Sequence, residues 1–282
     1  MKKIFTLGFV CFLLMMGKMD AQSKFYFGID GGYGFGFASS SYAPVFGSSV
    51  TYQNFVYSDS IAESKSIGAG FNFGGYIGYS ASKHISFEID ASYLLGKNVE
   101  YDYPVHHYTI EDSYGYTDSW KATTFRLIPT IKIKGDSARI VPYLKLGFSI
   151  GISPVINNDV TETHYFTSPN YPYSTSFDYT SDVSVKYSGG VALGFMASLG
   201  ADYKLSKCFD VFCECRIMSQ SFCPLKSEIT NYIVNGVSYP YPISYQYGAN
   251  TRYYYPLNSI GINIGITYHF GKKADTLNAP NQ

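Results

Sequence analysis

The residues of this chain that could do chemistry lie mostly in one polar stretch, YDYPVHHYTIEDSYGY, at positions 101–116. His106 and His107 precede Glu111 and Asp112, and a His beside paired carboxylates could serve a hydrolase as general acid and base. The same residues could bind a metal ion. Because a motif without a defined geometry often arises by chance, we expect an exposed polar loop here. We therefore predict no enzyme, no cofactor and no metal, and keep a loop-based hydrolase as an alternative.

A second set of reactive groups is spread along the chain. Nine charged side chains fall at alternate positions within apolar segments: Asp30, Glu88, Asp90, Arg126, Lys132, Lys145, Asp202, Glu214 and Arg216. Alternate residues of a β-strand point to opposite faces, so these charges share a face that their apolar neighbours avoid. Buried charges are costly unless they are paired. If that face is interior, the set predicts an ion-pair network.

The apolar neighbours define eight segments with an apolar residue at every second position. The segments are residues 25–37, 67–79, 85–95, 125–133, 140–152, 185–203, 209–217 and 260–270. In the last one, SIGINIGITYHF, four isoleucines, a Tyr and the final Phe270 share one face. No Asp, Glu, Lys or Arg occurs in any of the apolar sets. This period of two predicts eight β-strands, each with one uncharged face.

Short and long connections alternate between these segments. The links at 80–84, 134–139 and 204–208 are tight, whereas those at 38–66, 99–119, 153–183 and 220–257 are long. This layout is typical of outer-membrane barrels, and a closed barrel leaves no backbone group of a sheet unpaired in lipid. We therefore predict an all-β fold, an eight-stranded antiparallel up-and-down transmembrane β-barrel with short periplasmic turns and long extracellular loops. The alternative is a soluble sandwich whose apolar faces form a core.

The two ends of the chain predict export and the bounds of the barrel domain, and the net charge bears on possible partners. Residues 1–21 begin with Lys2 and Lys3, continue through an apolar run at 4–16 and end at Ala21. This is the layout of a cleaved secretory signal peptide. The barrel domain is then expected at 22–270 and a polar periplasmic tail at 271–282. The formal net charge is +0, so the charge balance suggests no nucleic-acid partner.

These features resemble the small outer-membrane barrels typified by the transmembrane domain of outer-membrane protein A. The resemblance covers residues 25–270 and includes the closing strand with its Phe270. It implies a multi-pass protein in the outer membrane of a Gram-negative-type cell, surrounded by membrane lipid and inserted by the barrel-assembly machinery. We expect a monomer. The peptidoglycan-binding domain of that family is not expected, since only the polar residues 271–282 follow the last strand.

The interior of an eight-stranded barrel is only wide enough for side chains to fill. Inward-facing glycines of the first two segments are expected to leave room for long charged side chains from the opposite wall. These glycines are Gly28, Gly32, Gly34, Gly36, Gly68, Gly70, Gly74 and Gly78. The nine charges then predict a structural ion-pair plug. A narrow or gated pore for ions and small solutes, in which the pairs rearrange, is the alternative.

The long loops are rich in tyrosine, which suits adaptable binding surfaces because a rigid ring adds contact area at low entropy cost. The candidate binding residues are Tyr101, Tyr103, Tyr108, Tyr114, Tyr116, Tyr171, Tyr173, Tyr239, Tyr241, Tyr245 and Tyr253. They predict a structural or surface-recognition role, with an extracellular protein or a glycan as ligand. Alternatively, these rings pack on one another and on strand extensions above the membrane.

Three local features carry predictions of their own. The pair Asn235-Gly236 signals a two-residue hairpin turn, either in an extracellular extension or in an extra transmembrane hairpin, and we expect the extension and eight barrel strands. Pro129 lies within a strand and predicts a β-bulge. The four cysteines beyond the signal peptide are expected to act as small apolar side chains rather than as disulfides or zinc ligands. They are Cys208, Cys213, Cys215 and Cys223.

Overall fold

The chain is all-β in the computed structural model, which describes residues 24–37, 66–103, 112–137, 139–167, 176–240, 244–246 and 254–270. Fourteen strands are present: β1 (Phe25–Gly36), β2 (Gly70–Ser80), β3 (Ile85–Gly96), β4 (Val99–Tyr103), β5 (Asp112–Lys134), β6 (Ile140–Thr167), β7 (Ser176–Ser188), β8 (Val191–Lys204), β9 (Phe209–Phe222), β10 (Lys226–Val234), β11 (Val237–Ser238), β12 (Ser244–Gln246), β13 (Tyr255–Pro256) and β14 (Ser259–His269). No helix within these ranges is long and apolar enough to cross a membrane.

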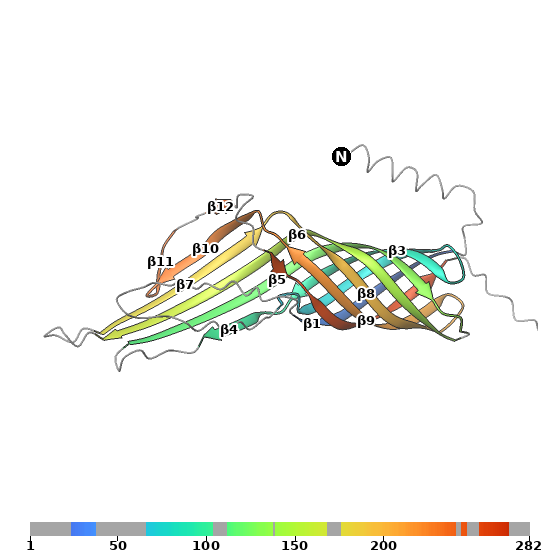
Figure 1. Cartoon of the computed structure of the whole chain (residues 1–282), viewed down its shortest axis with the longest axis horizontal. Helices are drawn as coiled ribbons and strands as arrows, with labels where there is room; N and C mark the ends of the chain where they lie inside the picture. Colours follow the sequence, from blue (N-terminus) through green and yellow to red (C-terminus); the bar gives the residue numbers. More distant parts are fainter. Residues whose placement is uncertain are drawn as a thin grey trace, which may run out of the picture.

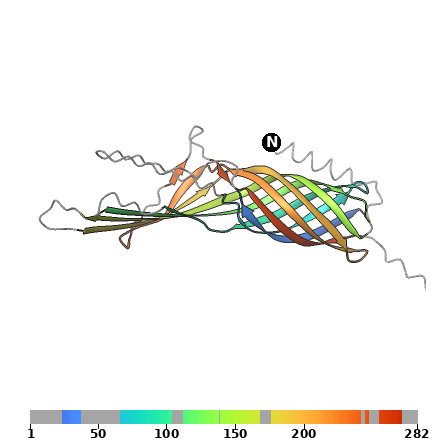
Figure 2. The ribbon, with the colours of Figure 1, turned by 60° about the horizontal axis from the view of Figure 1, so that its bottom comes forward.

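Eight of these strands close into a barrel, as predicted. Each pairs antiparallel with the next in the order β1, β2, β3, β5, β6, β8, β9 and β14, and β14 pairs back onto β1. The closing ladder runs without a break from Tyr26 opposite His269 to Gly36 opposite Ser259. Figure 2 shows the tilted strands crossing at the front and back of this barrel. Closure leaves none of the eight strands with a free edge.

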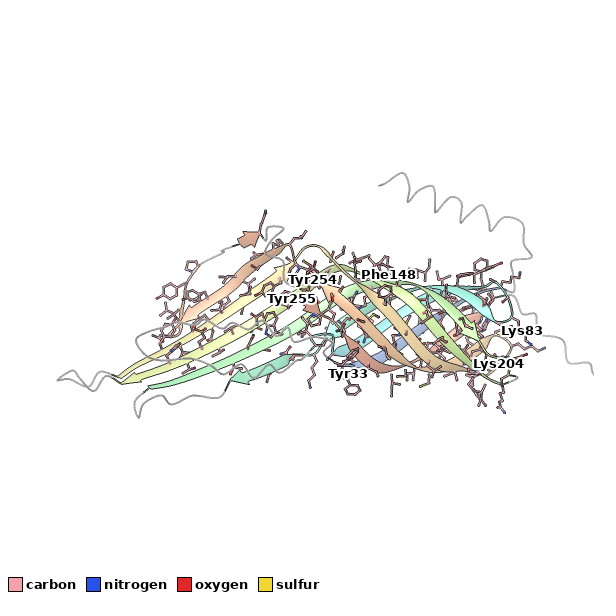
Figure 3. All side chains as sticks on the ribbon, viewed as in Figure 1. Tyr33, Lys83, Phe148, Lys204, Tyr254 and Tyr255 are labelled. Carbon is pink, nitrogen blue, oxygen red and sulfur yellow. The ribbon has the colours of Figure 1, made fainter. Side chains whose placement is uncertain are left out.

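The outer wall of the barrel is apolar. Ile29 is 63% exposed and Ile264 is 62% exposed, because the alternation turns these faces away from the lumen. Large side chains such as Phe148 and Tyr33 project from the ribbon in Figure 3. Within the barrel, which includes β5 over residues 125–134 and β6 over residues 140–152, the outward positions carry no Asp, Glu, Lys or Arg. An Arg or Lys at mid-bilayer depth on this wall would cost roughly 2–4 kcal/mol. The soluble-sandwich alternative is wrong, since the strands of the described residues form a single sheet and place no second sheet against these faces.

On one side the sheet continues beyond the barrel, and we call this part the extension. β6 pairs with β8 over residues 140–152 and with β7 over residues 156–167. β10 pairs with β7, and β4 pairs with the upper part of β5. Figure 1 shows these strands leaving the barrel together. Much of the sequence predicted as long loops at 99–119, 153–183 and 220–257 is therefore strand, because the paired strands continue their hydrogen-bond ladders beyond the barrel.

The junction between barrel and extension corrects two sequence predictions. The register of β5 and β6 shifts between Thr123 and Phe125, where Ser153 has φ 49°. Pro129 causes no such bulge, since the registers with β3 and β6 are the same on both sides of it. The predicted sixth segment is broken by Gly189 and Gly190, with φ 79° and 84°. These left-handed conformations suit glycine and separate β7 from β8.

Three residues assigned to the apolar outer faces lie elsewhere. Val185 belongs to β7 and packs, partly buried, against a cluster of buried side chains. Tyr187 belongs to β7, above the break, and is buried. Ile67 precedes β2 and is also buried, in the same cluster of side chains. The sequence alternation continues through all three positions, but the chain leaves the barrel wall there.

The predicted turn at Asn235-Gly236 is confirmed. Both residues have positive φ, 49° and 78°, and Val234 lies opposite Val237. This is the geometry that a two-residue hairpin with Asn-Gly requires. The hairpin joins β10 and β11 in the extension, so the barrel keeps eight strands.

Candidate functional site: the filled lumen and the sheet above it

A cluster of buried aromatic and aliphatic side chains closes the barrel at the end that carries the extension. Trp120 stacks on Tyr187 with ring centroids 5.7 Å apart, and Tyr255 lies 5.5 Å from Trp120 and 5.4 Å from Tyr187. The rest of this cap cluster is Ile67, Ala122, Ile156, Ala192, Phe222 and Leu257. These residues come from β5, β6, β7, β8, β9, β13 and two flanking segments, so the cap ties many strands together.

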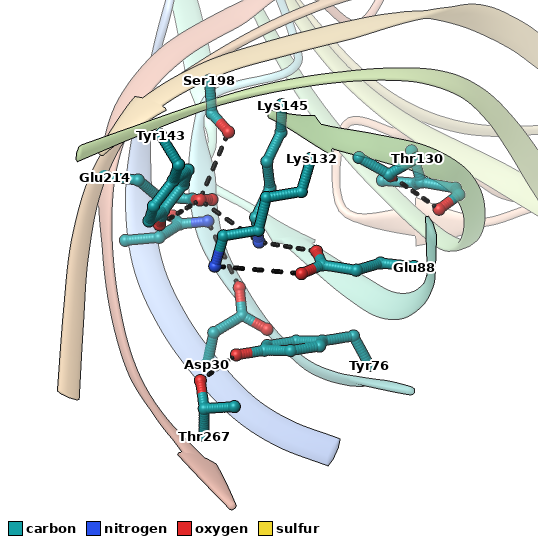
Figure 4. A network of polar contacts seen from close by, with 12 residues as sticks. Asp30, Tyr76, Glu88, Thr130, Lys132, Tyr143, Lys145, Ser198, Glu214 and Thr267 are labelled. Atoms are coloured by element: carbon teal, nitrogen blue, oxygen red, sulfur yellow. Dashed lines mark hydrogen bonds and ion pairs between the residues drawn. The ribbon is translucent and has the colours of Figure 1, made fainter. Parts of the chain in front are cut away.

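Beneath the cap, Lys145 of β6 joins two carboxylates from different walls. Its Nζ lies 2.9 Å from Glu88 Oε2 on β3 and 3.5 Å from Glu214 Oε2 on β9. All three side chains are almost fully buried. Figure 4 shows this pairing in the centre of the lumen. In so dry an environment, each charge depends on its partner for compensation.

The pairing continues in both directions from Lys145. Lys132 lies 2.8 Å from Asp202 and 3.9 Å from Glu88. Arg216 Nη2 lies 2.7 Å from Glu214 and 3.1 Å from Asp30. The order Asp202, Lys132, Glu88, Lys145, Glu214, Arg216 and Asp30 alternates in sign throughout. We call these seven residues the ion chain.

Tyrosine hydroxyls complete the coordination of the carboxylates in the ion chain. Tyr26 donates to Glu88 Oε1 at 2.8 Å, and Tyr143 donates to Glu214 Oε2 at 2.9 Å. Ser198 also donates to Glu214 Oε2, at 3.2 Å. The Lys132 ammonium lies 3.9 Å from the centroid of the Tyr143 ring. Hydrogen bonds and cation–π contacts thus stabilise charges of both signs.

Two of the inward glycines, Gly28 and Gly78, make room for tyrosine rings rather than for charges from the opposite wall. A Cβ on Gly78 would lie 2.2 Å from Tyr26 Cζ, and a Cβ on Gly28 would lie 2.4 Å from Tyr76 Cζ. Each glycine is the direct register partner of the tyrosine it accommodates. At these two positions a tyrosine of the neighbouring strand fills the space beside the glycine, instead of the charged side chain from the opposite wall that the sequence analysis expects.

Two of the nine predicted lumen charges lie outside the ion chain. Arg126 is bound by neutral amides: its Nε donates to Gln220 Oε1 at 3.0 Å and its Nη1 to Asn72 Oδ1 at 2.8 Å. Both carboxylate oxygens of Asp90 are buried without a hydrogen-bond partner among the residues described. The structure therefore brings seven of the nine together and leaves these two apart.

The tight-turn end of the barrel carries separate ion pairs. His269 Nε2 lies 2.7 Å from Asp210 Oδ2 at the barrel rim, where the alternation predicts an inward His269. Lys83 pairs with Asp136 at 2.7 Å between two exposed turns, and this hydrogen-bonded ammonium lowers the pKa of the Asp136 carboxyl. Lys83 and Lys204 mark this end in Figure 3.

The candidate catalytic stretch falls mostly outside the described residues. This is the case for His106, His107 and Glu111, while Asp112 is the first residue of β5. Within the described ranges, no group of three or more His, Cys, Asp and Glu side chains is placed to hold a metal ion.

The four cysteines within the described residues, Cys208, Cys213, Cys215 and Cys223, are all free thiols. Cys213 and Cys215 are exposed on the outer wall of β9, in the apolar band. Cys208 and Cys223 are partly exposed at the two ends of β9. No disulfide joins these four residues.

The candidate binding tyrosines are divided between extension strands and residues outside the description. Tyr101 and Tyr103 belong to β4, Tyr114 and Tyr116 to β5, and Tyr245 to β12. Tyr239 follows β11, is exposed, and lies 6.0 Å from Tyr232 between ring centroids. Tyr108, Tyr171, Tyr173, Tyr241 and Tyr253 lie outside the described residues.

The extension also carries a polar trough of about 350 Å³, which sequence reasoning missed. Amide and hydroxyl side chains dominate its lining, with one Lys and one Asp among them. The lining residues are Asn98, Lys121, Asn157, Asp159, Ser184, Val185 and Thr230. They come from β5, β6, β7, β10 and the β3–β4 link, which only the pairing of these strands brings together. The volume lies in the range of small-ligand sites.

The strand closure, the apolar outer wall and the filled interior define the class of this protein: it is a small eight-stranded transmembrane β-barrel. No protein-family model matches the chain, and no curated protein matches it either.

Solved structures of small barrels are similar to the chain. The outer membrane protein OprG from Pseudomonas aeruginosa has a TM-score of 0.39 at 12% identity, over 90% of this chain and 99% of that one. The N-terminal β-barrel domain of Pseudomonas aeruginosa OprF has 0.31 at 10%, over 88% and 100%. Acinetobacter baumannii CarO has 0.31 at 9%, over 86% and 97%. Because these TM-scores and identities are low, the assignment of the chain to the barrel class is based on its own strand pairing.

Proposed function

We propose that this protein is an outer-membrane anchor that holds the extension on the cell surface, where the extension binds a ligand. One combination carries the proposal: a lumen filled by the ion chain and closed by the cap cluster, continued on one side into a sheet with a polar trough. Because side chains fill the lumen, no open path through it is left for solutes. The surface beyond the barrel is then the part that can interact.

The uncharged outer wall and the secretory layout of residues 1–21 support the location. In the outer membrane of a Gram-negative-type cell the tight turns are periplasmic and the extension is extracellular, as in other barrels of this type. Membrane lipid and the barrel-assembly machinery are the corresponding partners. The role requires no catalytic residue and no cofactor.

The lining of the trough supports a polar ligand. The amides of Asn98 and Asn157, the hydroxyls of Ser184 and Thr230 and the carboxylate of Asp159 supply both donors and acceptors. Such groups match the hydroxyls of a glycan or the backbone of an extracellular protein segment. Tyrosines on the same strands can add ring area at the margins of the site.

The proposal can be tested with the protein in lipid nanodiscs. Its binding to arrays of defined oligosaccharides and peptides is measured. We expect Asn157→Ala combined with Asp159→Ala to weaken array binding about tenfold or more, since two hydrogen-bonding groups are lost. The matched control is Thr161→Ala with Asp182→Ala, an exposed hydrogen-bonded pair on β6 and β7 that lies outside the trough. Equal binding by both double variants, or no binding by the parent protein, contradicts the recognition role.

Conductance separates this role from the pore alternative. In planar bilayers the purified protein is expected to give no sustained open channels, because the ion chain and the cap cluster occupy the lumen. Sustained channels overturn the anchor role in favour of a pore.

A further inference from the structure

We propose that the lumen binds one monatomic anion, chloride under physiological conditions, beside Arg126. The site lies between the ion chain and the cap cluster and uses none of the contacts that hold either one together. It goes beyond the anchor role, since neither the filled lumen nor the surface trough depends on it.

Arg126 is a buried cation without a counterion. Its side chain is 1% exposed, and in the part of the chain that the structure describes no carboxylate lies within ion-pair distance of it. Its two hydrogen-bond acceptors, Gln220 Oε1 and Asn72 Oδ1, are neutral. Its third nitrogen, Nη2, is buried and has no acceptor among these residues. A buried guanidinium with only neutral partners and one unsatisfied nitrogen would be stabilised by a nearby negative charge.

A cavity of about 10 Å³ adjoins this guanidinium. Its polar lining consists of Asn72, Arg126, Arg216, Ser259 and Asn263, with Met218 beside them. A space of this size holds the centre of about one water-sized particle. A phosphate or a carboxylate is therefore too large, and the ligand is a single atom or a single water molecule.

The charges around the cavity favour an anion. Arg216 also borders it, but Arg216 already pairs with Glu214 and Asp30. With the amide of Asn263 turned to face Arg216, its oxygen accepts from Arg216 Nε at 2.9 Å. Arg126 is then the one cation at the cavity without an anionic partner. A water molecule would accept from Nη2 but leave the charge of the guanidinium unbalanced.

Asp90 is the obvious internal rival for this role, and the strand register explains why it does not fill it. Arg126 pairs with Ser92, whereas Asp90 pairs with Ile128, two residues further along the ladder of β3 and β5. Asp90 forms no ion pair with Arg126, and both its oxygens lack partners among the described residues. The positive charge beside the cavity is thus uncompensated locally.

Bromide replacement tests the site directly. Crystals of the full mature chain grown in sodium bromide are expected to show an anomalous difference peak beside Arg126 Nη2. Data from the Arg126→Gln protein are expected to lack that peak. A parent protein with no bromide peak at this position, or with an ordered water only, overturns the proposal.

Thermal unfolding in detergent gives a second readout. The unfolding midpoint is compared between sodium chloride and sodium gluconate at matched ionic strength and pH. The parent protein should gain roughly 5 °C in its midpoint over a hundredfold rise in chloride above the dissociation constant, as expected for a ligand of the native state. Arg126→Gln should lose this dependence. Arg139→Gln, an Arg on the tight-turn side that contacts Tyr203, should keep it and serves as the matched control.

Asn72→Asp keeps the experiment decisive if Arg126→Gln does not fold. The variant places a carboxylate where Asn72 Oδ1 accepts from Arg126 Nη1, so it supplies the missing counterion from within the protein. We expect this variant to fold and to be insensitive to chloride. A chloride dependence as large as that of the parent, in either lumen variant, overturns the proposal.

Discussion

The ring of Tyr26 lies directly across Gly78 of the neighbouring strand, in the space that a side chain at position 78 would occupy. A Cβ there would lie 2.2 Å from Tyr26 Cζ, and the ring crosses this point to donate its 2.8 Å hydrogen bond to Glu88. The absence of a side chain at one position therefore determines how a charge in the lumen is solvated.

Gly78→Ala is expected to destabilise the barrel by about 1–3 kcal/mol, because the methyl group displaces a tightly packed ring. Urea unfolding of the protein in detergent micelles measures the change. Gly31→Ala is the matched control, since its Cβ would point to the outer wall, with no atom nearer than 3.8 Å. If the two alanine variants have the same free energy of unfolding, the close approach of Tyr26 to Gly78 does not matter for stability.

Lys145→Met is expected to cost about 3–5 kcal/mol in the free energy of unfolding, because it leaves buried Glu88 and Glu214 without their shared cation. The measurement is again urea unfolding in micelles. Adding Glu88→Gln and Glu214→Gln to Lys145→Met should recover part of the loss, since the excess buried negative charge is then removed.

The control for Lys145→Met is Lys83→Met at the exposed pair with Asp136. It should leave the unfolding free energy unchanged, as for most surface ion pairs. A Lys145 variant as stable as the Lys83 variant contradicts a structural role for the ion chain.

The stability of the extension is expected to depend on pH through Asp118. Burial raises the pKa of its carboxyl, although hydrogen bonds from Trp120 and Asn158 oppose the shift. A carboxyl that binds its proton more tightly in the folded state stabilises the fold as the pH falls. Stability should therefore increase as the pH is lowered from neutral toward about 4, the ordinary pKa of Asp.

Asp118→Asn removes this titration and keeps an oxygen that can accept from Asn158. Protease resistance of the extension, measured between pH 4 and pH 8 in lipid nanodiscs, should depend less on pH in the variant than in the parent. The predicted sign is wrong if the parent extension becomes more resistant as the pH rises and the variant does not.

Cys213 and Cys215 test the direction of the outer wall. In a variant with Cys208→Ser and Cys223→Ser, both remaining thiols lie in the apolar band of β9. A water-soluble maleimide should leave them unlabelled in lipid nanodiscs and label both in denaturant, because thiolate attack requires access to water. Rapid labelling in the bilayer shows that this face does not contact lipid.

The local pattern of the sequence determined the barrel. Period-two alternation assigns Ile29 to the wall and Asp30 to the lumen, because consecutive side chains of a strand point to opposite faces. Turn chemistry likewise places the Asn235-Gly236 hairpin without reference to the rest of the chain. The uncharged faces and the unequal links then leave a closed sheet in lipid as the fold that satisfies every backbone group.

The tertiary structure alone decided which residues meet. Lys145 contacts Glu88 and Glu214 because barrel closure and strand tilt bring β6, β3 and β9 to one height, and no local pattern encodes that height. The same register leaves Arg126 and Asp90 outside the ion chain. Beyond the rim, pairing between distant segments builds the extension and its trough. Alternation reports the face of a residue, whereas its partner depends on how the whole sheet closes.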